Sequence, residues 1–470
     1  MISLVLAASL AAAPGPRAAT ASTTVVHIPR LDALQSVTSF FDRAGQTAAL
    51  LRPGVWYAEL HPFLSLDPSQ PATLRALGID PAGALTVSVR PTGRITCTQL
   101  ADATVFQEKA AEALRATARG QAALEPRTAA GITTLSVPRE SGAQAGYALK
   151  GQTACAFASG GGGFVDDGEG QALLKEVSRL VGKEPKADAR LAQLPGALHV
   201  MVPERGLVVG LDGGPNELRL EGTSTQLPLP PFQTGTASPY GAMKPEGLLF
   251  SRARVAPAGV AQAVGSVRAS IQQVCPGCPA SETAALARAV AERLTGHMVV
   301  LADGVRTRPN LNTAEGRFFA TRQALAAEVT DAAAMKAALA PLAKFPGARA
   351  LEDGWALDVK GGALLVRLRE RHLVLGNDVG VTGTLLAALP KEGAKLPHAV
   401  DFAVDPKKLA SGLNQVSLMD VVANRRLAGI FTLGMEMGPL LARSERLSGW
   451  LDSTSGGHRF SSIWTLPATP

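Results

Sequence analysis

The chain has 470 residues, 46% of them hydrophobic and only 4% aromatic, with a formal net charge of +7. This length predicts about two or three domains, whose cores Ala, Leu and Val must fill because aromatic residues are scarce. The basic residues are scattered, and we find no Lys/Arg block, no basic helix interleaved with aromatic residues and no nucleic-acid motif. These features argue against a nucleic-acid partner and leave open a weak, peripheral attraction to anionic membranes.

The first residues are typical of an export signal. Ile2–Ala13 is apolar and rich in Ala, and Ala19-Thr20-Ala21 fits the small-x-small pattern of a cleavage site. We therefore predict a signal peptide over residues 1–21 and an exported protein, either periplasmic or secreted. A disordered Ala-rich tail is the alternative. A later apolar stretch, Leu427–Leu441, contains Glu436 and is shorter than the roughly 20 residues that cross a membrane, so we predict no transmembrane segment after the signal.

The elements that follow the signal predict a mixed fold. We expect an edge strand at Val25–Ile28, an amphipathic helix at Leu31–Leu51 and a strand at Val55–Leu60. A hairpin follows, with strands at Ala84–Val89 and Arg94–Gln99. Hairpins separated by helices indicate an α+β fold rather than alternating βαβ units.

One pattern then occurs twice: an Asp-capped helix, three short apolar runs and a second helix. The cap is Asp102 in the first copy and Asp331 in the second. The apolar runs, which indicate an antiparallel meander, are Thr133–Val137, Ala145–Leu149 and Thr153–Ala158 in the first copy and Trp355–Val359, Ala363–Leu368 and His372–Leu375 in the second. Each copy continues into a Leu-Pro run, Leu194–Val200 or Leu396–Phe402.

The separation between the two copies changes along the chain. It is 229 residues between the two Asp caps, 202 between the two Leu-Pro runs, and 240 between the runs Leu207–Asp212 and Leu447–Asp452. Loops change length at a low free-energy cost, so a duplication tolerates this drift. Chance similarity between short patterns is the alternative. Duplication predicts two related halves, each an antiparallel, meander-rich sheet with helices packed on one face.

A Pro-rich stretch over residues 223–247 divides the halves and reads as a linker. The first α+β repeat then covers residues 22–222 and the second covers 248–470. The second repeat contains 38 extra residues, the difference between the last two separations. They form a predicted helical insertion at 403–446.

The insertion is the candidate binding element. Its segment Ser417–Arg443 has an apolar stripe wider than one helical face needs, while Gly434 and Gly438-Pro439 are expected to bend or end the helix. We predict that five apolar side chains bind a protein or an apolar ligand: Leu427, Ile430, Phe431, Met435 and Met437. The alternative is a core helix packed between the two halves.

Four cysteines fit an oxidising compartment. Cys97 and Cys155 lie in strand-like runs of the first half, and Cys275 and Cys278 form C-P-G-C in the second. Two cysteines in each half predict two disulfides within the halves. A redox site at C-P-G-C is the alternative, although the motif lies between two predicted helices rather than after a strand. No second C-x-x-C or paired His follows, which argues against zinc.

No other motif predicts catalysis, a metal or a cofactor. The Gly-rich stretch Ser159–Gly163 lacks the Lys-Ser/Thr of a phosphate-binding loop and reads as a flexible connection. Asp166, Asp167 and Glu169 are too few for a calcium site and suit the start of a helix. The seven histidines occur singly, and neither H-E-x-x-H nor G-x-S-x-G is present.

The stretch Leu77-Gly78-Ile79-Asp80-Pro81, together with the two Leu-Pro runs and the signal, resembles a group of uncharacterised exported bacterial proteins classed as domains of unknown function. The resemblance covers most of the chain. That group has no established catalytic residues, so it implies export and a repeated helix-plus-meander unit but assigns no role to any residue.

These observations predict an exported, non-enzymatic cell-envelope protein that binds a protein or apolar ligand through its insertion. A periplasmic thiol-disulfide protein using Cys275 and Cys278 is the alternative. A hydrolase whose catalytic residues are dispersed along the chain is a further one, but no motif supports it.

Overall fold

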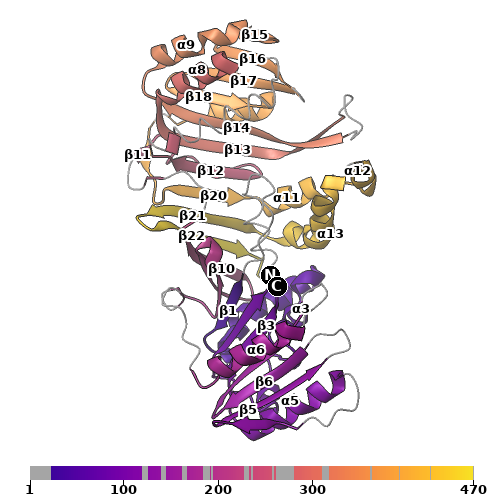
Figure 1. Ribbon diagram of the computed structural model, residues 1–470. Helices are drawn as coiled ribbons and strands as arrows, with labels where there is room; N and C mark the ends of the chain where they lie inside the picture. The colour runs from indigo at the N-terminus through magenta and orange to yellow at the C-terminus, as the bar shows by residue number, and fades with distance from the viewer. Residues whose placement is uncertain are drawn as a thin grey trace. The chain divides into compact units, whose positions relative to one another are not determined.

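The chain folds into two compact units, which divide between Leu227 and Pro228 (Figure 1). The computed structural model describes residues 23–118, 125–138, 144–160, 167–183, 191, 194–226, 232–233, 237–256, 259–260, 280–309, 317–359, 362–390, 392–423 and 425–468. The predicted signal peptide lies outside the described residues. The division between the units falls inside the stretch that the sequence predicts as a linker.

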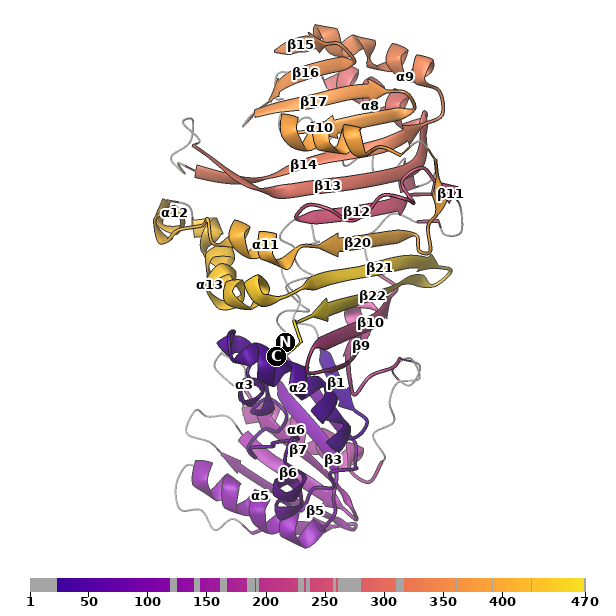
Figure 2. The ribbon, with the colours of Figure 1, turned by 180° about the vertical axis from the view of Figure 1, so that it is seen from behind.

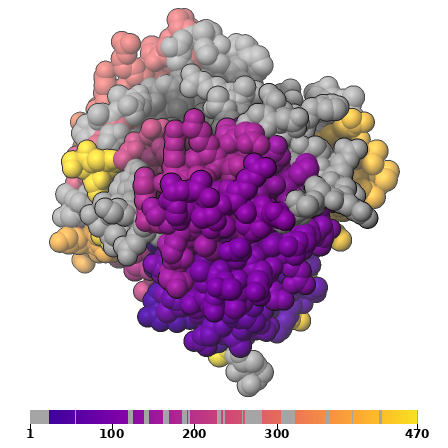
Figure 3. Space-filling model, turned by 60° about the horizontal axis from the view of Figure 1, so that its bottom comes forward, coloured from indigo at the N-terminus to yellow at the C-terminus, as the bar shows by residue number. Residues whose placement is uncertain are grey.

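The strands of the first unit form one antiparallel sheet. They are β1 (Thr24–Ile28), β2 (Leu85–Arg90), β3 (Gly93–Gln99), β4 (Arg127–Ala129), β5 (Ile132–Pro138), β6 (Gln144–Lys150), β7 (Thr153–Ser159), β8 (Leu198–Val202), β9 (Leu207–Gly214) and β10 (Glu217–Ser224). Their order across the sheet is β4-β5-β6-β7-β3-β2-β1-β8-β9-β10. Figure 3 shows this unit, in indigo to magenta, as a closely packed body.

Helices connect the strands of the first unit. They are η1 (Asp32–Leu34), α2 (Gln35–Gly45), η2 (Ala49–Leu51), α3 (Pro53–Tyr57), α4 (Pro71–Ala76), α5 (Ala103–Thr117), α6 (Asp167–Leu180) and η3 (Pro203–Arg205). The helix predicted at Leu31–Leu51 is thus divided into three pieces. The strand predicted at Val55–Leu60 is wrong, because α3 begins there with Pro53, whose fixed φ suits a first helical turn.

The second unit also forms an antiparallel sheet. Its strands are β12 (Leu249–Arg254), β13 (Leu294–Pro309), β14 (Arg317–Val329), β15 (Ala348–Leu351), β16 (Gly354–Val359), β17 (Gly362–Arg369), β18 (His372–Gly376), β20 (Val400–Val404), β21 (Arg446–Thr454) and β22 (Gly457–Thr465). Their order is β15-β16-β17-β18-β14-β13-β12-β20-β21-β22. Strand for strand, this is the order of the first unit. A separate short pair joins β11 (Ala237–Ser238) to β19 (Ala394–Lys395).

The helices of the second unit lie between strands that correspond, in chain order, to the strands that the helices of the first unit connect. They are α8 (Ala280–Ala291), α9 (Ala332–Leu339), η4 (Ala340–Lys344), α10 (Val379–Ala388), α11 (Pro406–Leu413), α12 (Leu418–Ala423), η5 (Arg425–Leu427) and α13 (Ala428–Arg443). The two predicted Asp caps are confirmed. Asp102 accepts hydrogen bonds from the backbone N–H groups of Thr104 and Val105, and Asp331 accepts them from Ala333 and Ala334, all within 2.8–3.1 Å.

Both sheets are covered on both faces. Tyr147 of β6 packs edge-on against Phe106 of α5, whereas the next residue, Ala148, belongs to the apolar cluster beneath α6. Likewise Leu373 of β18 packs with α9 and Val374 packs with α10; α8 and α9 are in front in Figure 1, and α10 is in front in Figure 2. Since neighbouring strand residues point to opposite faces, the prediction that the helices pack on one face is wrong. The middle strands are apolar on both faces, and each face therefore needs a cover.

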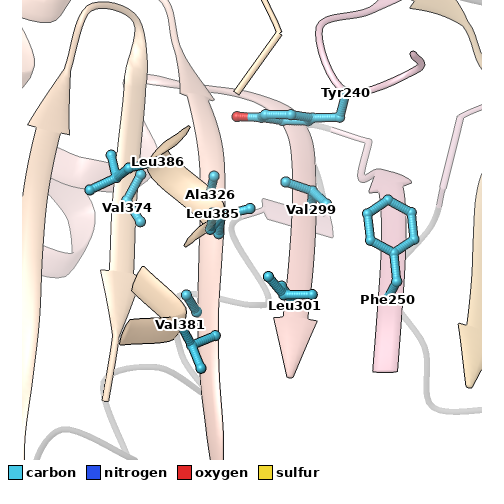
Figure 4. Packing of buried hydrophobic residues seen from close by; sticks show 10 residues of the cluster. Tyr240, Phe250, Val299, Leu301, Ala326, Val374, Val381, Leu385 and Leu386 are labelled. Atoms are coloured by element: carbon cyan, nitrogen blue, oxygen red, sulfur yellow. The ribbon is translucent and has the colours of Figure 1, made fainter. Parts of the chain in front are cut away.

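The core beneath α10 illustrates the packing (Figure 4). Phe250, Val299 and Val374, from three strands, belong to one cluster of buried side chains with Leu385 of the helix. Tyr240 closes this cluster and is fully buried, and its hydroxyl is 3.0 Å from Nδ1 of His372. A hydrogen bond of this kind removes most of the cost of burying the phenol.

Candidate binding surface

The helical insertion lies between β20 and β21 and consists of α11, α12, η5 and α13. In both Figure 1 and Figure 2 it extends beyond the ends of these strands, with α12 outermost. Asp405 caps α11, as it accepts hydrogen bonds from the N–H groups of Lys407 and Lys408 at 2.9 and 3.1 Å. At the start of α12, the Asp420 carboxylate accepts hydrogen bonds from the N–H and the hydroxyl of Ser417 at 2.9 and 2.6 Å.

Helix α13 packs closely along α11. A Cβ at Gly434 would lie 3.2 Å from the carbonyl oxygen of Leu413, and one at Gly438 would lie 2.9 Å from Oδ1 of Asn414. The glycines therefore allow the two helices to approach each other and do not end α13. The helix continues through Pro439 to Arg443, because the buried side chains beyond the proline hold its last turns in place.

The five residues predicted to bind a ligand do not share one environment. Leu427 and Met437 are buried. Phe431 is half-buried. Ile430 and Met435 are exposed and remain accessible to a partner.

The most exposed apolar side chains are on α12, which the sequence-based prediction did not select. Leu418, Met419 and Val422 are 61%, 75% and 71% exposed. We group them with the three exposed apolar residues of α13 under the name insertion surface: Leu418, Met419, Val422, Ile430, Leu433 and Met435. Within the described part of the chain, the other large apolar side chains with comparable exposure are Leu50, Leu180, Leu351 and Val379, which are scattered over other elements.

The exposed charges on the helices of the insertion are basic. Among the described residues of these helices, the exposed charged side chains are Lys407, Lys408, Arg425 and Arg443. Lys408 forms an ion pair with Asp303 at 2.6 Å. Of the insertion's acidic groups, Asp420 is buried, Asp405 and Glu436 are partly exposed, and Glu445, which follows α13, is exposed. Of the basic residues, Arg425 is the one that follows α12 closely in the chain.

The disulfide predicted within the first half is present between Cys97 and Cys155. These residues lie directly opposite each other on β3 and β7, and Cys155 is fully buried. Cys275 and Cys278 are outside the described residues, as are Gly161–Gly163 and Asp166 of the motifs considered above.

A polar cluster on the second sheet was not expected from the sequence. Nδ1 of His398 is 3.0 Å from the Asp452 carboxylate, and the imidazole stacks on Trp450 at 4.2 Å. Burial raises the pKa of the nearby Asp401 carboxyl, an effect that the Arg252 guanidinium 3.5 Å away partly offsets. A carboxylate can orient a catalytic imidazole, but here the ring lies flat against an indole. We assign the cluster a structural role in joining β21 to the segment before β20.

Neither a metal-binding cluster nor a membrane-spanning helix is found in the described part of the chain. There, no group of three or more His, Cys, Asp or Glu side chains is arranged to hold a metal ion. No helix among the described residues is long and apolar enough to cross a bilayer.

Comparison with known proteins adds no assignment. No family model, no curated protein and no solved structure matches this chain. The resemblance to uncharacterised exported bacterial proteins therefore stays a prediction.

Proposed function

We propose that this protein is an exported, non-enzymatic binding protein of the cell envelope, built from two related α+β units, and that it binds its partner through the insertion surface. The observation that carries the proposal is the concentration of six exposed, large apolar side chains on α12 and α13. Exposed apolar patches on soluble proteins usually mark sites of interaction, whereas single exposed residues do not.

Export is supported by the signal-like N-terminus and by the disulfide. Disulfides persist in oxidising compartments such as the periplasm and are rare in the cytosol. The bond between Cys97 and Cys155 therefore agrees with an exported protein. The intact mass of protein recovered from the exported fraction should be that of the chain without residues 1–21. Recovery of the full-length chain in the cytosol would contradict this part of the proposal.

The relation between the units is supported by the strand order and by the pairing register. In the first unit Gln99, three residues before the cap Asp102, pairs with Thr153. In the second unit Glu328, three residues before the cap Asp331, pairs with His372. Thr153 and His372 each begin the last strand of their meander. The caps and the strand pairs therefore correspond to each other across the two units.

The same correspondence continues on the other side of the sheet. Leu198, the residue before His199, pairs with Leu211. Val400, the residue before Asp401, pairs with Leu451. His199 and Asp401 are 202 residues apart, and Leu211 and Leu451 are 240 apart. These are the separations found between the matched sequence runs. Chance similarity of short patterns would not reproduce them in the hydrogen-bonding register, so we favour a duplication.

The binding role can be tested by photo-crosslinking in cells. A photo-reactive phenylalanine analogue at the position of Met419 is expected to form adducts in cells that export the protein. The matched control is the position of Val379, which is equally exposed at 75% but lies outside the insertion. Adducts at both positions, or at neither, would contradict the assignment of the binding surface to the insertion.

A further inference from the structure

We infer that the insertion surface docks on the surface of an anionic lipid bilayer. This inference rests on the proposed function, because it names the partner of the same surface. Two observations lead to it: the exposed apolar side chains are aliphatic, and the exposed charged side chains of the insertion's helices are basic, with Arg425 just beyond α12. Interfacial helices that contact anionic membranes combine these two features.

The shape of the insertion favours a bilayer over a small apolar ligand. Leu418, Met419 and Val422 lie on the outermost helix and keep 61–75% of their surface accessible. A small-molecule site is concave and buries most of its ligand, so its lining residues are largely covered by their neighbours. Side chains this accessible on a projecting helix are instead placed to enter a surface that surrounds them.

The composition favours lipid over a protein partner. The centres of protein interfaces are enriched in Trp and Tyr, whose rigid rings fill pockets of fixed shape on the partner. The insertion surface contains only Leu, Met, Val and Ile, and the single aromatic ring of the insertion's helices, that of Phe431, is half-buried. Flexible aliphatic side chains suit an acyl-chain boundary, which has no fixed shape to match.

The polar groups of α12 are arranged so that the helix can enter the membrane interface at a low free-energy cost. Asp420 is only 6% exposed, and its carboxylate accepts hydrogen bonds from Ser417. The negative charge is therefore turned away from the lipid side. Arg425 begins η5, two positions beyond the end of α12, and is exposed, so that it can approach phosphate groups.

Vesicle sedimentation tests the inference on the full mature chain. We expect binding to vesicles of phosphatidylcholine with about one quarter phosphatidylglycerol and weaker binding to phosphatidylcholine alone. Replacing two aliphatic side chains in the variant Met419→Ser/Val422→Ser should lower the partition coefficient by roughly tenfold or more. Arg425→Glu should weaken binding to the anionic vesicles, and this effect should shrink in high salt.

The control variant is Val379→Ser, which removes an equally exposed aliphatic side chain elsewhere in the same unit and should leave binding unchanged. The substituted residues are exposed, so near-UV circular dichroism should show the same folded state for every variant. Absence of vesicle binding, or equal losses for the Met419→Ser/Val422→Ser and Val379→Ser variants, would overturn the inference.

The two experiments separate the inference from the proposed function. If vesicles do not bind but the analogue at Met419 crosslinks to a protein, the binding surface stands and the lipid inference fails. If neither vesicles nor crosslinked adducts are found, both fail. Lipid adducts at Met419 together with binding to anionic vesicles would support both.

Discussion

Removing the disulfide of the first unit should cost a large part of that unit's stability. The bond between Cys97 and Cys155 spans 58 residues. In the chain-entropy model, a closed loop of this size stabilises the folded state by about 4 kcal/mol at 25 °C. The free energy of unfolding of a typical domain is only about 5–15 kcal/mol. The variant Cys97→Ala/Cys155→Ala leaves no buried thiol or hydroxyl without a partner, so its loss of stability should approach the entropic value.

The sequence offers a clean reporter for this measurement. Trp56 is the only tryptophan of the first unit, and it packs against Phe41 and Tyr57, so its fluorescence should change when that unit unfolds. The three tryptophans of the second unit can be replaced by Phe: Trp355, Trp450 and Trp464. Guanidinium titration should then show the first-unit free energy of unfolding reduced by about 4 kcal/mol.

The second unit provides the internal control. The midpoint of its unfolding transition is followed by tryptophan fluorescence in the chain that retains all three of its tryptophans. This midpoint should not change when the disulfide is removed. A first-unit loss below about 1 kcal/mol would refute the entropic reasoning. A parallel loss in the second unit would show that the two units do not unfold independently.

Acid should destabilise the first unit, because burial lowers the pKa of His61 from its ordinary value of 6.5 to about 3. The unfolded chain then binds a proton between these values and the folded chain does not, so stability is full above pH 6.5 and is lost as the pH falls toward 3. Urea titrations at several pH values should show this, and His61→Gln should flatten the profile. Ala326 and Val374 pair directly, at the register position that Cys97 and Cys155 occupy in the first unit. Ala326→Cys/Val374→Cys should therefore form a disulfide, detected as no increase in free thiols after air oxidation; two new reactive thiols would contradict the correspondence.

The parts of the fold that the sequence predicts correctly depend on local signals. An Asp before an apolar run is a helix cap, and both Asp102 and Asp331 act as one. The meander strands are recognisable because turn residues separate short apolar runs. The error at α3 is also local: Val55–Leu60 has a strand-like composition, but Pro53 starts a helix there.

The parts that the sequence does not predict depend on contacts between distant residues. Whether helices cover one or both faces of a sheet follows from which neighbours each strand acquires, and strand composition alone does not fix this. The contact of His398 with Trp450 likewise arises only when β20 pairs with β21. On the insertion, the predicted segment Ser417–Arg443 is divided into α12, η5 and α13, and Leu418 and Met419 are exposed on the first of these helices. The Ser417-x-x-Asp420 capping pattern marks the start of α12, where the predicted segment also begins, but it does not indicate where α12 ends.

One connection between neighbouring strands differs greatly in length between the two units. In the first, β8 is joined to β9 by the short helix η3, Pro203–Arg205. In the second, the equivalent connection between β20 and β21 is the whole helical insertion. Since a three-residue helix is enough to make this connection, the closure of the sheet does not explain the longer one. The buried residues of α13 stabilise the insertion against α11, but they do not account for the exposed aliphatic side chains of α12, which any polar residue would replace at no cost to folding. This difference between the two connections is the reason why we propose the binding surface there.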